Sequence, residues 1–163
     1  MHGEFLSELK GKITDVVIIS VPEGNRVNAE FNGTLRGPKI NGSAKGIDYV
    51  LFREDGTGIL HVHGVITTEE NDLIYVEASG FATPTEDEGC SDLKETVACQ
   101  TASEKYAWLN TALVVSEGYF DVRAGEVYLK YFVLSLANRV QVNKIFFEKN
   151  SPQLRSKSLN ITN

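Results

Sequence analysis

The sequence has few of the residues that build metal sites, membrane spans or nucleic-acid surfaces. Among its 163 residues are two cysteines and three histidines, and it has no Cys-x-x-Cys or His–Cys spacing typical of a zinc site. The longest apolar run near its start, residues 16–19, is too short to span a bilayer or to form the core of a signal peptide. Lysine and arginine number 16 against 22 acidic residues, without a basic stripe that would neutralise phosphates. We therefore expect a cytoplasmic protein with no membrane or nucleic-acid partner.

Motifs for cofactor and nucleophilic chemistry are also absent. The sequence has no glycine loop to cradle a phosphate, no nucleophile elbow and no dinucleotide fingerprint. A nicotinamide enzyme, a kinase and a serine hydrolase are therefore not expected, and no cofactor is predicted. Cys90 and Cys99 lie in a polar stretch, where free thiols are expected in a reducing compartment; a disulfide closing this small loop is the alternative.

The sequence does contain a succession of short strand patterns, with hardly any helical periodicity. Turn residues separate the patterns, and Asp55-Gly56 is a strong hairpin signal. The succession predicts an all-β fold with little helix, a single antiparallel β-barrel over about residues 12–136. We prefer a barrel to a sandwich because closure hides strand edges and accommodates polar strand faces in a lumen. The expected strands cover residues 12–21, 27–35, 47–54, 58–67, 73–81, 106–116 and 126–136.

Three segments fall outside this strand pattern. Residues 1–11 suggest one turn of helix, and residues 137–163 form a C-terminal extension of the single domain, 1–163. Residues 82–105 are acidic and polar and predict a long insert. Such an insert is either a lid or binding loop, or a mobile loop without a role.

Two histidines stand out at the centre of the strand over residues 58–67. His61 and His63 are two apart and therefore share one strand face, opposite the apolar face of the same strand. We expect this polar face to line the lumen. The pair then has three interpretations: metal ligands with Asp48 or Glu77 as a third, acid and base groups, or structural histidines.

Aromatic and amide side chains share a face of the expected strand over residues 106–116. Tyr106, Trp108 and Asn110 are the kinds of group that stack on a planar ligand and orient it, although a lone tryptophan is more often part of a core. Asp48 is either a turn cap or an inward-pointing general base whose pKa is raised by burial.

Several short motifs follow one another along the chain: Gly37-Pro38, Gly42, Gly46, Asp48, Arg53, Asp55-Gly56, Ile74-Tyr75-Val76 and Ala107-Trp108-Leu109-Asn110. Their order and spacing resemble those of a family of small barrels. The resemblance covers about residues 31–136 and is to the domain of unknown function DUF3237, related to lipocalin-like and allene-oxide-cyclase-like barrels. It implies a barrel fold without a settled activity. His61 and His63 stand where the family usually has an acidic and then a basic residue.

These observations lead to three functional hypotheses. The first is a barrel that binds a small apolar or aromatic metabolite in its lumen, with five side chains converging on one cavity: His61, His63, Tyr106, Trp108 and Asn110. The second is a cofactor-independent isomerase, cyclase or lyase in which a histidine is the acid or base, which rests on analogy between folds. The third is a structural or interaction protein whose lumen is filled by aliphatic side chains.

A homodimer is predicted from apolar residues that the strand pattern places on the outer wall. A monomer seldom exposes a large apolar patch, so a second copy or the C-terminal extension should cover them. A two-fold dimer to which residues 140–163 contribute is expected. The residues concerned are Leu109, Leu113 and Val115 in one strand, and Val127, Leu129 and Val133 in another.

Overall fold

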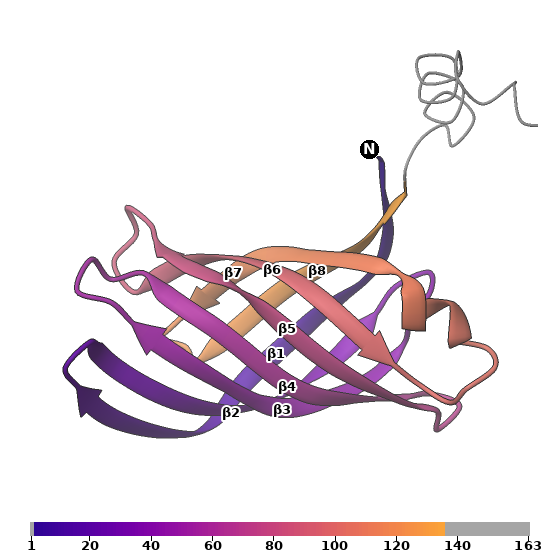
Figure 1. The fold of residues 1–163 in the computed structure, drawn as a ribbon, viewed down its shortest axis with the longest axis horizontal. Helices are drawn as coiled ribbons and strands as arrows, with labels where there is room; N and C mark the ends of the chain where they lie inside the picture. Colours follow the sequence, from indigo (N-terminus) through magenta and orange to yellow (C-terminus); the bar gives the residue numbers. More distant parts are fainter. Residues whose placement is uncertain (1, 136–163) are drawn as a thin grey trace, which may run out of the picture.

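A computed structural model of the protein describes residues 2–135, so the expected C-terminal extension lies outside the described residues. Eight strands form one closed antiparallel barrel, in which each strand pairs with its neighbour in sequence and β8 pairs with β1 (Figure 1). The expected all-β antiparallel barrel is confirmed. Its elements are β1 (His2–Val21), β2 (Gly24–Arg36), β3 (Gly42–Phe52), β4 (Gly58–Thr68), β5 (Leu73–Pro84), β6 (Cys90–Gln100), the 3-10 helix η1 (Ala107–Thr111), β7 (Leu113–Asp121) and β8 (Glu126–Ser135).

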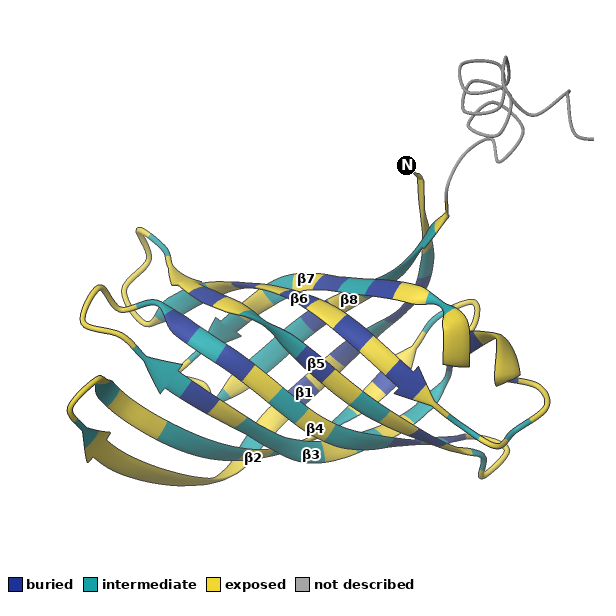
Figure 2. Cartoon of the chain, viewed as in Figure 1, coloured by how far each residue is buried: buried dark blue, intermediate teal, exposed yellow. Residues whose placement is uncertain are grey.

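Side chains alternate between the lumen and the outer surface along each strand. In β6 every second side chain from Leu93 to Cys99 is buried, and the residues between them are exposed. Figure 2 shows this alternation as bands of buried and exposed residues along the strands. The core lies inside the barrel and includes Leu6, Leu9, Leu35, Val50, Leu60, Ile74, Val97, Val114 and Leu129.

The β3–β4 hairpin forms as its turn residues predict. Gly56 adopts φ of 81°, a left-handed conformation that glycine takes without a steric cost. The Asp55 carboxylate accepts hydrogen bonds from the Thr57 backbone N–H at 3.0 Å and from Arg53 at 2.7 Å. These bonds hold the pKa of Asp55 below its usual value, the Thr57 amide having the largest effect.

The expected polar insert over residues 82–105 is wrong for most of its length. Its centre is β6, which pairs with β5 from Tyr75↔Gln100 to Pro84↔Ser91 and with β7 on its other side. Cys90 and Cys99 are free thiols near opposite ends of this strand, as preferred. Nine residues of extended chain span about 30 Å, far more than a disulfide can bridge.

Two other predictions also need correction: the helical turn over residues 1–11 and the strand over residues 106–116. β1 begins at His2 rather than at residue 12, so no helical turn precedes it. The strand expected over residues 106–116 begins only at Leu113, after η1. A bulge between Phe5 and Ser7 shifts the register of β1 against β8, and Leu6 and Ser7 are consequently both buried.

The apolar wall proposed for the homodimer is wrong in β8. Val127 and Leu129 line the lumen, and Val133 packs against the core. Leu109 is buried in η1, while Leu113 is 55% exposed. Within residues 2–135, no helix is long and apolar enough to cross a membrane.

Two neighbouring residues of β5 test the side-chain register directly. Ile74 is 0% exposed and faces the core, whereas Leu73 is 62% exposed on the outer wall. We expect Ile74→Ala to lower the free energy of unfolding by about 2–5 kcal/mol, because it removes buried methyl groups and leaves a cavity. Leu73→Ala, the matched control, should change it by less than about 0.5 kcal/mol. Urea unfolding measures both, and equal losses would contradict the register.

Candidate lumen site

The barrel encloses a cavity of about 480 Å³. η1 lies across one end of the barrel, where Leu109 is 1% exposed and lines the cavity (Figure 1). At the other end the lining residues Val16, Ile18 and Val122 are 46%, 66% and 61% exposed. The cavity therefore has one closed end and one open end with an apolar rim. Its size is that of a small-molecule pocket. The lumen filled by aliphatic side chains that the third hypothesis expected is not observed.

The walls of the cavity are mostly apolar, with a few polar side chains among them. Every strand contributes to the lining, mainly through aliphatic residues. Polar groups in such a lining fix the orientation of a ligand and select its chemistry. The polar and thiol residues of the lining are Ser7, Lys45, Asp48, Glu95, Cys99 and Tyr131.

Asp48 reaches the lumen from β3, where its inward position follows from strand alternation. Its Oδ1 accepts a hydrogen bond from the backbone N–H of His61 at 3.1 Å. The regular pairing of β3 with β4 is interrupted next to Asp48, because it runs to Asp48↔Val62 and resumes only at Leu51↔Ile59. Burial, followed by the charge of Glu95, raises the pKa of Asp48 to about 7, and the His61 amide opposes this shift. Asp48 therefore changes its charge near neutral pH.

Glu95 enters the same cavity from β6 and is 7% exposed. Ser116, itself 4% exposed, donates its hydroxyl to Glu95 Oε2 at 2.6 Å. Burial raises the pKa of Glu95, and the Ser116 hydroxyl offsets part of that increase. A carboxyl group this deep in an apolar lumen favours its neutral form.

Two further ionisable groups of the lumen are held neutral. Burial raises the pKa of the Cys99 thiol to about 11. Burial, with the charges of Glu95 and Cys99, raises the pKa of Tyr131 as well. A thiol in these surroundings is a poor nucleophile, so Asp48 and Glu95 are the groups suited to proton transfer.

His61 and His63 do not line the lumen, and this prediction is wrong. Both imidazoles are exposed on the outer face of β4, because the apolar face of the strand points inward. Ser79 Oγ lies 3.4 Å from His61 Nδ1, and the Tyr75 hydroxyl lies 2.7 Å from His63 Nδ1. A tyrosine hydroxyl thus lies within hydrogen-bond reach of an imidazole, but on an open surface. Their catalytic role remains a prediction that the lumen geometry does not support.

The aromatic and amide residues near η1 do not converge on the cavity either. Trp108 is 40% exposed, and the Asn110 side chain exchanges hydrogen bonds with the Thr101 backbone at 2.8 and 3.0 Å. Tyr106 is 3% exposed and donates its hydroxyl to Glu70 at 3.3 Å. The parity argument failed here because a 3-10 helix replaces the expected strand. Of the predicted site residues, only Asp48 lines the lumen.

Glu95 is the lumen residue that the sequence prediction missed. The alternating apolar residues Leu93, Val97 and Cys99 mark one face of a strand, and Glu95 falls on that face. An acidic residue on an otherwise apolar strand face is the signal that would have identified it. Polar neighbours on the other face concealed the pattern.

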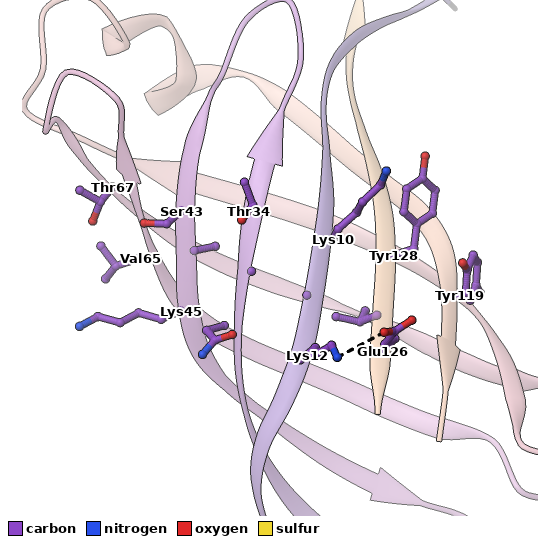
Figure 3. Close-up of a pocket in the computed structure, with 15 residues that line it drawn as sticks. Lys10, Lys12, Thr34, Ser43, Lys45, Val65, Thr67, Tyr119, Glu126 and Tyr128 are labelled. Atoms are coloured by element: carbon purple, nitrogen blue, oxygen red, sulfur yellow. Dashed lines mark ion pairs between the residues drawn. The ribbon is translucent and has the colours of Figure 1, made fainter. Parts of the chain in front are cut away.

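A second hollow, of about 690 Å³, lies on the outer wall rather than in the lumen. Figure 3 shows its side chains spread along the surface of several strands, with Lys12 paired to Glu126. Lys10 pairs in turn with Glu8, which also accepts the Tyr128 hydroxyl at 2.6 Å. Exposed charges that are largely paired with one another contribute little binding energy to a ligand. We therefore prefer the lumen as the candidate site.

Metal ligation was one interpretation of the histidine pair. Asp48 faces the lumen, so it lies on the other side of the β-sheet wall from His61 and His63. Residues 2–135 contain no group of three or more His, Cys, Asp or Glu side chains arranged to hold a metal ion.

Fold and lumen together define a class: closed, eight-stranded antiparallel barrels with an internal cavity that opens at one end. Residues 2–134 match the family described as protein of unknown function (DUF3237), and the chain belongs to that family. The resemblance identified from the sequence is therefore confirmed. No curated protein matches the chain.

Several solved structures share the fold. A β-barrel-like protein from Acinetobacter baumannii AYE has 20% identity, covers 82% of this chain and 96% of its own, and gives a TM-score of 0.75. A protein with unknown function from Clostridium acetobutylicum ATCC 824 has 22% identity, coverages of 82% and 99%, and a TM-score of 0.74. An enzyme from Penicillium herquei has 22% identity, coverages of 82% and 94%, and a TM-score of 0.56. At these identities the likeness establishes the fold alone.

The raised pKa of Asp48 predicts how stability depends on pH. Its folded pKa of about 7 lies above the ordinary value of 3.8, so between these values the folded state binds more protons than the unfolded state. The free energy of unfolding should therefore fall as pH rises from about 4 to about 7. Asp48→Asn should flatten this fall by up to about 1.4 kcal/mol per pH unit. Asp92→Asn, on the exposed face of β6, is the matched control. Urea unfolding across this range measures the slopes, and an unchanged slope in Asp48→Asn would contradict the assignment.

Proposed function

We propose that the protein binds a small, mostly apolar molecule in the lumen of its barrel. The observation that carries this proposal is the cavity of about 480 Å³, with apolar walls and few polar groups. Apolar ligand surface moved from water into such walls gains about 25 cal/mol per Å². The apolar rim formed by Val16, Ile18 and Val122 suits the passage of the same kind of molecule.

The polar groups of the lumen restrict the charge of the ligand. Asp48 and Glu95 repel an anion once either is ionised, and the one basic residue that the described lining contains, Lys45, is exposed and also borders the hollow on the outer wall. A neutral or basic molecule that carries one or two hydrogen-bonding groups fits better, and aromatic compounds are included in this class. Fatty acids and other carboxylates fit less well, because their charge would meet a carboxyl group in an apolar site.

Catalysis in the lumen is the second candidate function. One structural neighbour, from Penicillium herquei, is described as an enzyme. Catalysis in a barrel of this fold is therefore worth testing, although a shared fold does not imply a shared reaction. The histidine mechanism loses its geometric basis, since both imidazoles lie outside the lumen. A carboxyl-based mechanism is the form of this hypothesis that the site supports.

Two alanines at adjoining strand positions provide a test of lumen binding. Ala78 is 4% exposed and lines the cavity from β5, whereas Ala98 is exposed on the outer face of β6. N-phenyl-1-naphthylamine, a neutral apolar dye that fluoresces in dry surroundings, should bind the wild-type barrel and raise its unfolding temperature by mass action. Ala78→Phe should weaken binding at least about tenfold by filling the cavity, and Ala98→Phe should not.

Dye fluorescence and thermal unfolding are measured together, so that a misfolded Ala78→Phe variant is recognised by its own melting curve. A smaller replacement, Ala78→Leu, then takes its place. Equal dye affinity in the Ala78 and Ala98 variants, or no binding by the wild type, would contradict a lumen site.

We also propose that the protein forms a homodimer. β1 pairs with β8 only as far as Lys12↔Glu126, while its pairing with β2 continues to Val21↔Gly24. The part of β1 beyond Lys12 also carries exposed apolar side chains that do not line the cavity and that a second copy could cover: Val17 and Ile19. Light scattering at micromolar concentration should give twice the mass of one chain, and a single-chain mass would contradict the dimer.

A further inference from the structure

Two carboxyl groups share the cavity, and within residues 2–135 neither of them forms an ion pair. Asp48 enters from β3 and Glu95 from β6, and Glu95 is close enough that its charge raises the pKa of Asp48. Burying a carboxyl group without a cation is costly, and apolar residues of similar volume would give a more stable barrel. A container for apolar molecules requires neither residue. Their presence indicates a task beyond holding the ligand.

A third polar group in the same lining also lacks a partner. Ser7 is 0% exposed, lines the cavity, and its Oγ makes no hydrogen bond within residues 2–135. Buried hydroxyl groups nearly always have a hydrogen-bond partner, and one left unsatisfied lowers folding stability, as burial of the two carboxyl groups does.

We propose that Asp48 and Glu95 form a proton-transfer site for a neutral, largely apolar substrate that carries a weakly acidic proton. This inference rests on the proposed lumen binding and adds chemistry to it. Asp48 is the base, because it has a backbone N–H at 3.1 Å to stabilise its carboxylate and is the less buried of the two. Glu95, at 7% exposure, is the acid.

The proposed reaction is an isomerisation that needs no oxidant, reductant or cofactor. A carbon–hydrogen bond of the substrate breaks, its proton passes to Asp48 Oδ2 or Oδ1, and the electron pair moves into the conjugated system of the substrate. The Glu95 O–H bond then breaks and its proton is added at a second substrate atom. Asp48 is left protonated and Glu95 ionised, and proton exchange with water through the open end restores the starting state.

Other titratable groups near the pair are compatible with these roles. Around the lumen they are Cys99 of β6 and Tyr131 of β8, both of which burial keeps neutral, and Lys45 of β3, which is exposed and also lines the outer groove. Neither neutral group competes with Asp48 for a proton near pH 7. The charge state of the site is therefore set by the two carboxyl groups as a coupled pair.

A model substrate tests the proposal without knowledge of the natural one. 5-Nitrobenzisoxazole is neutral, planar and apolar; a base removes its ring C–H proton, the N–O bond breaks, and a coloured cyanophenolate forms. The wild-type barrel should catalyse this elimination, with a rate that rises with pH around a midpoint near the Asp48 value of about 7. Asp48→Asn should lower kcat/KM at least about 100-fold.

Two control variants separate this site from the rest of the molecule. Asp92→Asn makes the same chemical change on the outer face of β6, and His63→Ala removes an exposed imidazole; both should retain wild-type rates. Glu95→Gln should retain the elimination and its pH midpoint, because the donor Glu95 is neutral while Asp48 titrates and this substrate needs only the base. If Glu95 were the base instead, the same change would abolish turnover.

The outcomes are decisive in both directions. No turnover by the wild type, or turnover that Asp48→Asn retains, overturns the proposal. If Asp48→Asn does not fold, the Glu95→Gln profile decides, and loss of turnover in that variant overturns the assignment of Asp48 as the base. Binding of N-phenyl-1-naphthylamine that Ala78→Phe abolishes, together with no proton transfer, leaves the binding proposal standing and removes only the chemistry. Absence of dye binding removes both.

Discussion

The pairing of β1 with β8 is the constraint on which the rest of the molecule depends. It joins the two ends of the described sheet through positions from His2↔Ser135 to Lys12↔Glu126, and so turns a meander of hairpins into a closed wall. Closure gives each strand two partners and fixes its register. Because alternate residues point to opposite sides, the same register determines which side chains meet in the lumen.

That constraint explains why the lumen and the outer wall have such different chemistry. Asp48 and Glu95 are drawn into low-dielectric surroundings by their strand positions, at a cost in folding stability that rises as they ionise. On the surface, Arg36–Glu69, Lys39–Glu4 and similar pairs remain in water and contribute little. The residues that lower folding stability are therefore those proposed to carry out the chemistry, a compromise that is common at functional sites.

The sequence allowed the fold class, most hairpins and the family to be predicted, because turn chemistry and alternation are local signals. Alternation also showed correctly that His61 and His63 share a face, but it does not reveal which face points inward. Which face points inward depends on how distant strands close the barrel. In the structure the two histidines lie outside and Asp48 lies inside. Residues 106–112 failed for a different reason: their spacing fits a strand, whereas a 3-10 turn with Leu109 inward closes the end of the barrel.

The closure of one end by η1 makes the lumen a blind channel. A guest molecule must arrive and depart through the same apolar rim, so one must leave before the next can take its place. The thickness of a guest is limited by the barrel wall, but its length is not, since a tail can project past Ile18 and Val122 into solvent. Analogues that differ only in tail length should therefore bind with similar affinity, whereas those with a bulkier head should not enter the lumen.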